Sequence, residues 1–360
     1  MRKYNIPIFV PHKGCPFDCV FCNQNRITGH IKSVTPDEVT DIIERYLATI
    51  EAASTNRNEY IIEVAFFGGS FTGIQIEEQS ALMERVEPYI KSGRIDGIRL
   101  STRPDYISRE ILDNLKRYNV TAIELGVQSL VPEVLEASNR GHTPEQVKAA
   151  VSLIRKYDFS LGLQMMTGLP GDTPERSEYT AEQIIAMKPD CVRIYPTLTI
   201  KDTALETLYK RGEYVPETLD EAVELSKNLL LMFEAAGIAV IRIGLQPTDE
   251  INEDASVVAG PFHASFGELV ESAVYYDIAR TQIMGMTGDI EIYVNPREIS
   301  KMTGNRRSNI IKLQKEFNIT VKIKGDSNLE KREVNCIPAR NAIAMLPKAT
   351  NGVGGEMRCF

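Results

Sequence analysis

Three cysteines stand close together near the start of the chain, in the stretch GCPFDCVFC. Cys15, Cys19 and Cys22 follow a C-x3-C-x2-C spacing, which lets three thiolates converge on one metal centre. Thiolates are soft ligands of the kind that iron–sulfur clusters select. Three protein ligands on a four-iron cluster leave one iron open to a substrate or cofactor. The alternative is a structural zinc site with His12 or His30 as fourth ligand, although the spacing is unlike that of paired C-x2-C zinc modules.

The other three cysteines are scattered along the sequence. Cys191 lies in an apolar, strand-like segment and is expected in the core. Cys336 and Cys359 carry no assigned role. Six cysteines in 360 residues, half of them in one motif, favour a metal site in a reducing compartment over a disulfide framework. We therefore expect a cytoplasmic protein.

Short apolar segments alternate with helix-period segments from Ile6 to about Leu245, and these elements must position the motif. The expected strands are Ile6–Val10, Ile61–Phe67, Ile98–Ser101, Ala122–Val127, Ser160–Met166, Cys191–Tyr195 and Ala239–Ile243. Helix-start signals stand at Thr35, Ser108, Thr143 and Thr173. Repeated β-then-α order predicts a parallel sheet. Six or seven such units indicate an α/β fold, a partial (β/α)6-type barrel whose chemistry lies at the carboxyl ends of the strands.

Length and composition exclude several classes of protein. A net charge of −8 argues against a surface that binds nucleic acid over its whole extent. No stretch approaches the ~18 uninterrupted apolar residues of a membrane helix, so we expect no membrane contact. The first residues lack the apolar core of a secretory signal.

The chain is expected to have four parts. Residues 1–245 form the barrel, and residues 246–288 form an extension that packs on it. Residues 289–325 form a small, basic α+β module, and residues 326–360 form a C-terminal tail. Residues 290–324 hold eight Lys or Arg against three Asp or Glu, a net charge of +5, whereas the rest of the chain carries −13. The argument against nucleic-acid binding therefore applies to the barrel alone.

Further motifs follow the cysteines in order, and together they resemble the radical SAM enzyme superfamily over residues 6–245. Phe21 is the aromatic residue before the third cysteine, and Gly68-Gly69-Ser70 follows the second strand. The resemblance implies a 4Fe–4S cluster on the three cysteines and S-adenosylmethionine (SAM) against these four residues. In that family, reductive cleavage of SAM gives a 5′-deoxyadenosyl radical that abstracts hydrogen from the substrate. A Gly-Gly pair without the cysteine motif would be interpreted as a simple turn.

The resemblance also assigns SAM contacts further along the chain. Gln128, Arg140 and Gln164 match positions that line the ribose and carboxylate of SAM. The alternatives are hydrogen bonding at strand ends for the two glutamines and a surface ion pair for Arg140. His142 and His263 are candidate proton carriers, with a structural role as the alternative.

Two branches of the superfamily share these motifs, the catalytic subunit of Elongator and oxygen-independent coproporphyrinogen dehydrogenase. The segments 101–105 (STRPD), 194–197 (IYPT) and 260–272 favour the Elongator branch. About 88 residues follow Ser272, too few for that enzyme's acetyltransferase domain beside the other elements. We therefore expect no acetyl-CoA chemistry.

The basic module resembles the core of a KH RNA-binding module: strand, helix, Gly-x-x-Gly-like loop, helix, strand. Such loops clamp a nucleic-acid backbone, and Arg307 stands here in place of the second glycine. An arginine suits the geometry of a phosphate. The candidate RNA contacts are Lys301, Gly304, Asn305, Arg306, Arg307 and Lys312. The alternative is a small lid or dimerisation module with a solvated basic face.

Three functions follow from these patterns. The first is an RNA-modifying radical SAM enzyme in an anaerobic cytoplasm, with tRNA as a candidate substrate and flavodoxin or ferredoxin as electron donor. The second is a radical SAM enzyme that acts on a small metabolite or tetrapyrrole. The third is a non-catalytic RNA-binding protein with a structural metal. The oligomeric state is not readable from the sequence.

Overall fold

The computed structural model describes residues 2–10, 18–23, 34–53, 56–245 and 256–339. The chain divides into two compact units, Met1–Gly267 and Glu268–Phe360. Each unit has its own apolar core. None of the helices in these ranges is both long enough and apolar enough to cross a membrane.

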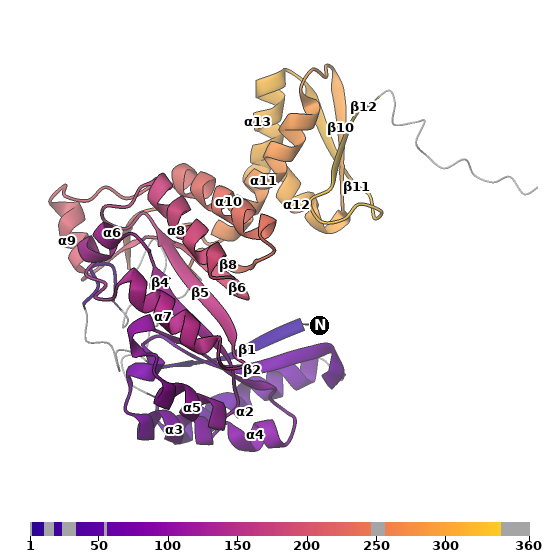
Figure 1. Cartoon of the computed structure of the whole chain (residues 1–360). Helices are drawn as coiled ribbons and strands as arrows, with labels where there is room; N and C mark the ends of the chain where they lie inside the picture. The colour runs from indigo at the N-terminus through magenta and orange to yellow at the C-terminus, as the bar shows by residue number, and fades with distance from the viewer. Residues whose placement is uncertain (1, 11–17, 24–33, 54–55, 246–255, 340–360) are drawn as a thin grey trace, which may run out of the picture. The chain divides into compact units, whose positions relative to one another are not determined.

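The first unit is built on seven parallel strands that curl into a half-barrel (Figure 1). The strands follow one another in the sheet in chain order, β1-β2-β3-β4-β5-β6-β8. This arrangement confirms the predicted partial barrel, and a strand occurs in each of the seven predicted places. The strands are β1 (Arg2–Phe9), β2 (Tyr60–Phe67), β3 (Gly97–Thr102), β4 (Val120–Gln128), β5 (Ser160–Thr167), β6 (Cys191–Pro196) and β8 (Ala239–Ile243).

Helices connect consecutive strands of the half-barrel. The four predicted helix starts are confirmed, and at α5, α7 and α8 the Ser or Thr hydroxyl accepts a hydrogen bond from a first-turn backbone N–H. The helices are α2 (Pro36–Ala53), α3 (Ile76–Glu84), α4 (Glu87–Lys91), α5 (Arg109–Arg117), α6 (Pro132–Ala137), α7 (Pro144–Ile154), α8 (Pro174–Ala186), α9 (Ala204–Lys210) and α10 (Leu219–Ala235). Short 3-10 turns lie at η1 (Arg57–Glu59), η2 (Phe71–Gly73) and η3 (Pro104–Tyr106). A two-stranded ribbon pairs β7 (Thr199–Ile200) with β9 (Val257–Ala259).

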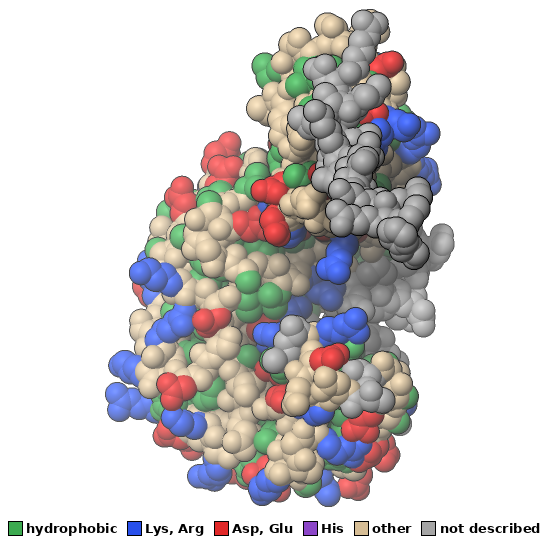
Figure 2. All heavy atoms as spheres, turned by 90° about the vertical axis from the view of Figure 1, so that its right-hand side faces the viewer, with side chains coloured by type: hydrophobic (Ala, Val, Ile, Leu, Met, Phe, Trp, Pro, Cys, Tyr) green, Lys and Arg blue, Asp and Glu red, His purple; other side chains and the backbone are tan. Residues whose placement is uncertain are grey.

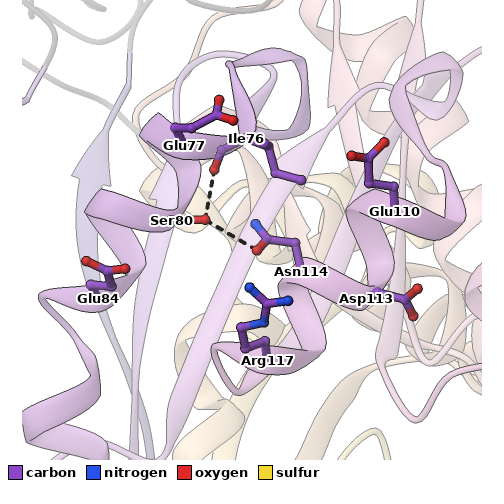
Figure 3. A pocket seen from close by; sticks show the side chains of 8 residues that line it. All are labelled: Ile76, Glu77, Ser80, Glu84, Glu110, Asp113, Asn114 and Arg117. Atoms are coloured by element: carbon purple, nitrogen blue, oxygen red, sulfur yellow. Dashed lines mark hydrogen bonds between the residues drawn. The ribbon is translucent and has the colours of Figure 1, made fainter.

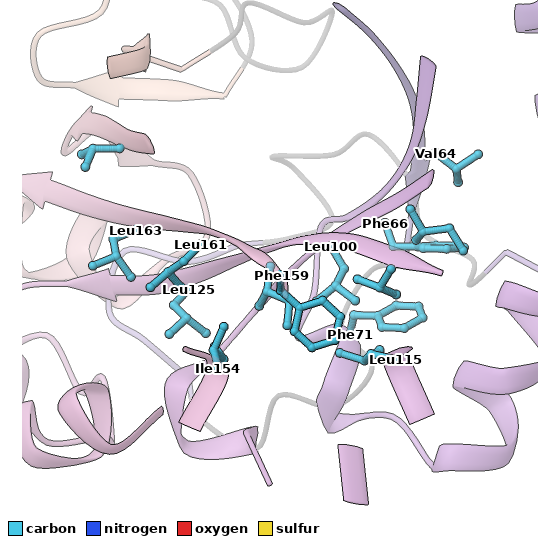
Figure 4. Close-up of a cluster of buried hydrophobic side chains, with 14 of the residues drawn as sticks. Val64, Phe66, Phe71, Leu100, Leu115, Leu125, Ile154, Phe159, Leu161 and Leu163 are labelled. Atoms are coloured by element: carbon cyan, nitrogen blue, oxygen red, sulfur yellow. The ribbon is translucent and has the colours of Figure 1, made fainter. Parts of the chain in front are cut away.

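Alternate residues of the strands pack against the helices and form the core of the first unit (Figure 4). On β2, Val64 and Phe66 are fully buried on this side, and the Phe66 ring stacks on Phe71 with centroids 4.7 Å apart. Burying a side chain of this size contributes roughly 1.5–3 kcal/mol. Because side chains alternate along a strand, Glu63 and Ala65 point to the opposite, concave side of the sheet.

The second unit is a three-stranded sheet packed on helices, with strand order β11-β10-β12. Strand β10 pairs in parallel with β11 and antiparallel with β12. The predicted order of strand, helix, turn, helix and strand is present. The elements are α11 (Phe266–Ile283), β10 (Asp289–Val294), η4 (Pro296–Glu298), α12 (Ile299–Thr303), η5 (Asn305–Arg307), α13 (Ser308–Phe317), β11 (Thr320–Gly325) and β12 (Val334–Pro338).

The division between the units differs from the four expected parts in two places. The expected extension, 246–288, is shared: β9 pairs with β7 of the first unit, whereas Tyr275, Ala279 and Ile283 of α11 lie in the core of the second. The expected tail holds β12, in which Val334 and Cys336 are buried in the same core. The apolar face of α11 and the alternation in β12 are the physical reasons for both differences. Residues 246–255 and 340–360, with Cys359, lie outside the described residues.

Candidate active site at the carboxyl ends of the strands

The loop after β1 carries the cysteine motif, and residues 18–23 of it are described. Cys19 is buried and Cys22 is half-buried, with the Cys22 N–H donating to the Cys19 carbonyl at 3.0 Å. Cys15 lies outside the described residues, as do His12 and His30. No three potential metal ligands converge among the residues that the structure describes, which include two of the three motif thiols. The assignment of the cluster to these three cysteines therefore stays a prediction.

Two distant segments hold the described part of this loop from different sides. The Val20 N–H donates to the Ser138 carbonyl at 3.1 Å, and the Asn139 side-chain amide donates to the Asp18 carbonyl at 2.9 Å. From the other side, the Leu205 N–H donates to the Val20 carbonyl at 2.7 Å. The loop is thus fixed to the segments that follow β4 and β7.

Phe21 anchors the loop through apolar contact. Its ring packs against a small cluster formed by Val131, Val134 and Leu169, with Met166 beside it. The structure therefore shows a packing role for this side chain.

The glycine motif follows β2. Gly68 has φ 99°, a conformation that glycine adopts without steric cost. The Ser70 side chain is buried and its hydroxyl lies 2.9 Å from that of Thr102, while the Arg103 N–H donates to the Ser70 oxygen at 3.2 Å. Ser70 thus ties the turn to the end of β3, and the backbone of Gly68 and Gly69 is the part left half-buried.

The end of β4 is distorted at the predicted cofactor residue Gln128. This residue has φ 66°, and the pairing of β4 with β5 shifts register between Gly126 and Gln128. A left-handed conformation in a residue other than glycine costs on the order of 1 kcal/mol and often marks a functional site. The Gln128 side-chain carbonyl is buried and accepts no hydrogen bond.

Arg140 lies beside this distortion and contacts the cysteine loop. Its side chain is buried, with Nη2 donating to the Gly126 carbonyl at 2.7 Å and Nη1 donating to the Cys19 sulfur at 3.5 Å. The Arg103 side chain donates a hydrogen bond to the Arg140 backbone carbonyl at 2.8 Å and so fixes the Arg140 backbone. The Nε–H of Arg140 is buried without a partner.

His142 completes this group. Burial, with Arg140 and Arg103 nearby, lowers the pKa of His142 to about 3, so the imidazole is neutral at physiological pH. Its Nε2 lies 3.2 Å from the Val127 carbonyl, which can only accept, so Nε2 carries the proton and Nδ1 is a buried acceptor without a partner. A proton carrier at neutral pH needs a pKa closer to 7, so this environment suits a hydrogen-bonding role. The other candidate, His263, accepts at Nδ1 from the Ser265 N–H.

Three residues at or after the end of β4 carry unpaired buried polar atoms: Oε1 of Gln128, Nε of Arg140 and Nδ1 of His142. Of the three, Arg140 also contacts the cysteine loop, at Cys19. An unpaired buried group costs about 1–3 kcal/mol, and a bound ligand that supplies the missing hydrogen-bond partner removes that cost. A guanidinium N–H fits a carboxylate, and the two acceptors fit hydroxyl or ammonium donors. This donor and acceptor set fits the methionyl and ribose groups of SAM.

Gln164 takes part in a network that the sequence analysis missed. Its amide nitrogen lies 3.1 Å from a carboxylate oxygen of Glu124 and 3.3 Å from the Ser101 hydroxyl. Glu124 is almost fully buried and bonds Arg99 at 2.7 Å and Arg193 at 3.0 Å. These charged residues occupy the concave side of β3, β4 and β6. One signal in the sequence could have predicted these ion pairs. Each of the three strands is otherwise largely apolar but carries one charged residue: Arg99, Glu124 or Arg193.

The predicted RNA contacts fall into two groups in the second unit. Arg306 and Arg307 are exposed and left-handed, with φ 49° and 65°. Gly304 before them has φ 77°, and a Cβ there would lie 2.9 Å from the Asn309 nitrogen, so glycine is required. Asn305 is exposed beside them.

The two lysines make contacts within the second unit, although Lys312 is exposed. Lys301 has only 18% of its side chain exposed, and its ammonium binds Glu298 at 2.9 Å. The Lys312 ammonium lies over the Tyr276 ring, 5.8 Å from its centroid. The structure thus presents the two arginines and not Lys301 as the accessible cations of this turn.

A separate groove of about 730 Å³ opens between α3 and α5 (Figure 3). Its lining is mainly acidic, with Glu77 and Glu84 on α3 and Glu110 and Asp113 on α5. It holds no cysteine and is lined by the covering helices, so it is distinct from the site at the strand ends. On the face drawn in Figure 2, acidic and basic side chains are interspersed over the barrel unit.

Comparisons with known proteins agree with this geometry. Residues 9–184 match the model of the radical SAM superfamily, and residues 189–276 match that of the radical SAM C-terminal domain. The tRNA uridine(34) acetyltransferase of Methanocaldococcus jannaschii is 28% identical over 259 residues, which cover 61% of this chain and 47% of that protein. Elongator complex protein 3 of Schizosaccharomyces pombe is 34% identical over 139 residues, which cover 38% of this chain and 26% of that protein. The chain thus spans half or less of these relatives' length.

A solved structure shares the fold. The archaeal Elp3 of Methanocaldococcus infernus superposes with a TM-score of 0.59 at 22% identity, over 78% of this chain and 63% of that one. The residues that match the two domain models include the cysteine loop and the ends of the half-barrel strands described above. The chain therefore belongs to the radical SAM superfamily, whose members are enzymes that use a 4Fe–4S cluster and SAM.

Proposed function

We propose that this chain is a radical SAM enzyme that modifies RNA, with tRNA as the substrate class. Cys15, Cys19 and Cys22 hold the cluster in this proposal. The observation that carries the cofactor assignment is the set of unpaired buried atoms on Gln128, Arg140 and His142 after β4, together with the contact of Arg140 with Cys19. RNA as the substrate is supported by relatives whose names specify a tRNA uridine.

SAM binding is assigned to residues at the ends of β2 and β4. The half-buried backbone of Gly68 and Gly69 offers close approach to the methionyl group, and the Arg140 Nε–H offers a donor to its carboxylate. Gln128 and His142 offer acceptors. When bound, the cluster and SAM supply a radical that abstracts hydrogen from the substrate. The protein's own part is to orient SAM and to keep water from the reacting atoms.

RNA contact is assigned to the turn before α13. Arg306 and Arg307 are adjacent and exposed, and they follow Gly304 in a tight turn. The turn therefore presents two arginine side chains from neighbouring positions. Arginine is suited to bind phosphate in a bidentate manner. Two successive arginines in the left-handed region store backbone strain, and strained residues cluster at functional sites.

Mass spectrometry of nucleosides tests this proposal. Total RNA from a strain without the gene is compared with RNA from the parent and from strains complemented with the wild-type chain or with Cys19→Ala. The expected result is one nucleoside that is lost in the deletion strain, restored by the wild-type chain and not restored by Cys19→Ala. Identical nucleosides in all four strains, together with an accumulated small metabolite in the deletion strain, would contradict an RNA substrate.

A further inference from the structure

We propose that Arg140 donates a hydrogen bond to the Cys19 sulfur in the working enzyme and thereby raises the reduction potential of the cluster. The inference rests on the proposed assignment of Cys19 as a cluster ligand, and not on the identity of the substrate. It gives Arg140 a second task besides the SAM contact that the superfamily resemblance implies.

The position of the guanidinium is fixed independently of any cofactor. Nη2 donates to the Gly126 carbonyl at 2.7 Å, and the Arg140 backbone is held at both ends, by its N–H to the Leu135 carbonyl and by Arg103 on its own carbonyl. Gly126 leaves room for this approach, since a Cβ there would lie 2.8 Å from Arg140 Nη2. The residue is 7% exposed, so little water competes for its donors.

The cysteine is fixed toward the same point. Segment 138–140 holds the motif loop through the Ser138 carbonyl and the Asn139 amide, on either side of Cys19 in the sequence. The contact between Arg140 Nη1 and the Cys19 sulfur, 3.5 Å, is therefore part of a three-residue clamp. Because adjacent residues build it, the sulfur and the guanidinium keep their relative position.

The three nitrogen atoms of the Arg140 guanidinium have different partners. Nη2 binds the protein backbone, Nη1 binds the Cys19 sulfur, and the unpaired Nε–H is left for an acceptor on SAM. One planar cation thus contacts the cluster ligand and faces the cofactor.

The expected effect on the cluster follows from electrostatics. Reduction adds one electron to the cluster, supplied by a low-potential one-electron donor, and makes the cluster and its thiolates more negative. A buried cation and an N–H···S hydrogen bond stabilise the more negative state, and hydrogen bonds to the sulfurs are among the factors that set cluster potentials. Loss of Arg140 is therefore expected to make the cluster harder to reduce.

Potentiometric titration followed by electron paramagnetic resonance tests the proposal, on the full chain reconstituted anaerobically without SAM or RNA. At the wild-type midpoint potential, Arg140→Gln is expected to lower the ratio of reduced to oxidised cluster about tenfold, a shift of about 59 mV for one electron. Arg140→Lys, which keeps the charge, is expected to shift less. Gln128→Ala, which removes a SAM contact without touching Cys19, is expected to leave the SAM-free potential unchanged. An unchanged potential in Arg140→Gln with a full complement of iron would overturn the proposal.

A measurement on the wild-type chain covers the case in which Arg140→Gln does not hold a cluster. The reduced protein, labelled with ¹⁵N in its arginine guanidinium groups, is expected to show a ¹⁵N coupling to the cluster spin in pulsed resonance spectra. Absence of that coupling would overturn the proposal. Both readouts are independent of RNA, so a failure of the RNA assignment leaves them interpretable.

Discussion

The hydroxyl oxygens of Ser70 and Thr102 lie 2.9 Å apart and join the glycine motif after β2 to the end of β3. The Thr72 hydroxyl lies 2.6 Å from the same Thr102 oxygen. All three side chains are buried, and the hydroxyl groups bond to one another, while the Arg103 N–H also donates to Ser70. Thr102 therefore positions the turn whose backbone is assigned to SAM, although it is not itself assigned a contact with SAM.

Thr102→Val is expected to weaken SAM binding about tenfold, which corresponds to about 1.4 kcal/mol. Valine has nearly the shape of threonine, but it leaves the Ser70 and Thr72 hydroxyls without their shared partner, and an unpaired buried group costs about 1–3 kcal/mol. Equilibrium binding of SAM to the reconstituted protein measures the effect. Thr102→Ser keeps the hydroxyl and should bind SAM nearly as the wild type does. Equal affinity in Thr102→Val and the wild type would contradict the positioning role.

Glu217 gives the protein a pH-dependent stability. Its carboxylate accepts from the Thr167 hydroxyl at 3.1 Å, and burial, with Asp172 nearby, raises the pKa of Glu217 from 4.5 to about 7. Between these values the folded chain holds a proton that the unfolded chain releases, so stability falls as the pH rises through this window and stays lower above it. Glu217→Gln removes the charge and is expected to raise the free energy of unfolding at pH 8 by roughly 1–3 kcal/mol.

Thermal or urea unfolding at two pH values checks this expectation. At pH 5 the folded carboxyl is protonated and ionisation of the unfolded chain has only begun to lower stability, so the gain from Glu217→Gln should be less than about 1 kcal/mol. Glu213→Gln, at an exposed position of the same segment, should change stability at neither pH. A gain in Glu217→Gln that is equal at pH 5 and pH 8 would show that burial of the charge is not its cause.

The arginine turn is expected to set the salt dependence of RNA binding. Each phosphate contact contributes about −0.7 for a single strand to about −0.9 for a duplex to the slope of log K against log salt. Arg306→Ala with Arg307→Ala should therefore reduce the magnitude of the slope by up to about two and weaken binding most at low salt. Filter binding of total tRNA over a series of salt concentrations measures the slope.

Lys301→Ala is the matched control within the same unit. The Lys301 ammonium binds Glu298 and is largely covered, so its removal should leave the slope unchanged. If Lys301→Ala reduced the slope as much as the arginine pair does, the result would contradict the assignment of the RNA contact to the exposed turn.

The elements of the half-barrel could be predicted because their signals are local. Most strands contain a short apolar run. Thr143 is followed by Pro144 and accepts a hydrogen bond from the Gln146 N–H, as expected of a capping residue. The boundary between the units could not be predicted in the same way. Tyr275 and Ile283 of α11 are apolar in the sequence, but which core they pack into depends on contacts with distant segments.

The site was predicted in its residues but not in its contacts. The spacing of Cys19 and Cys22 is readable in one dimension, whereas the bond from Arg140 to Cys19 joins residues 121 positions apart. The buried pairing of Glu124 with Arg99 arises only when neighbouring strands align. Charged residues within apolar strands were the one available signal, and their partners lie on other strands.

Modification of tRNA by the purified chain is the decisive test of an RNA substrate. The full chain is reconstituted with iron and sulfide and incubated anaerobically with SAM, a low-potential reductant, the small-molecule fraction of a cell extract and tRNA from the deletion strain. The expected products are 5′-deoxyadenosine and a new modified nucleoside in the tRNA, and both should be lost in Cys19→Ala. Formation of 5′-deoxyadenosine that depends on the extract while the tRNA stays unmodified would contradict an RNA substrate.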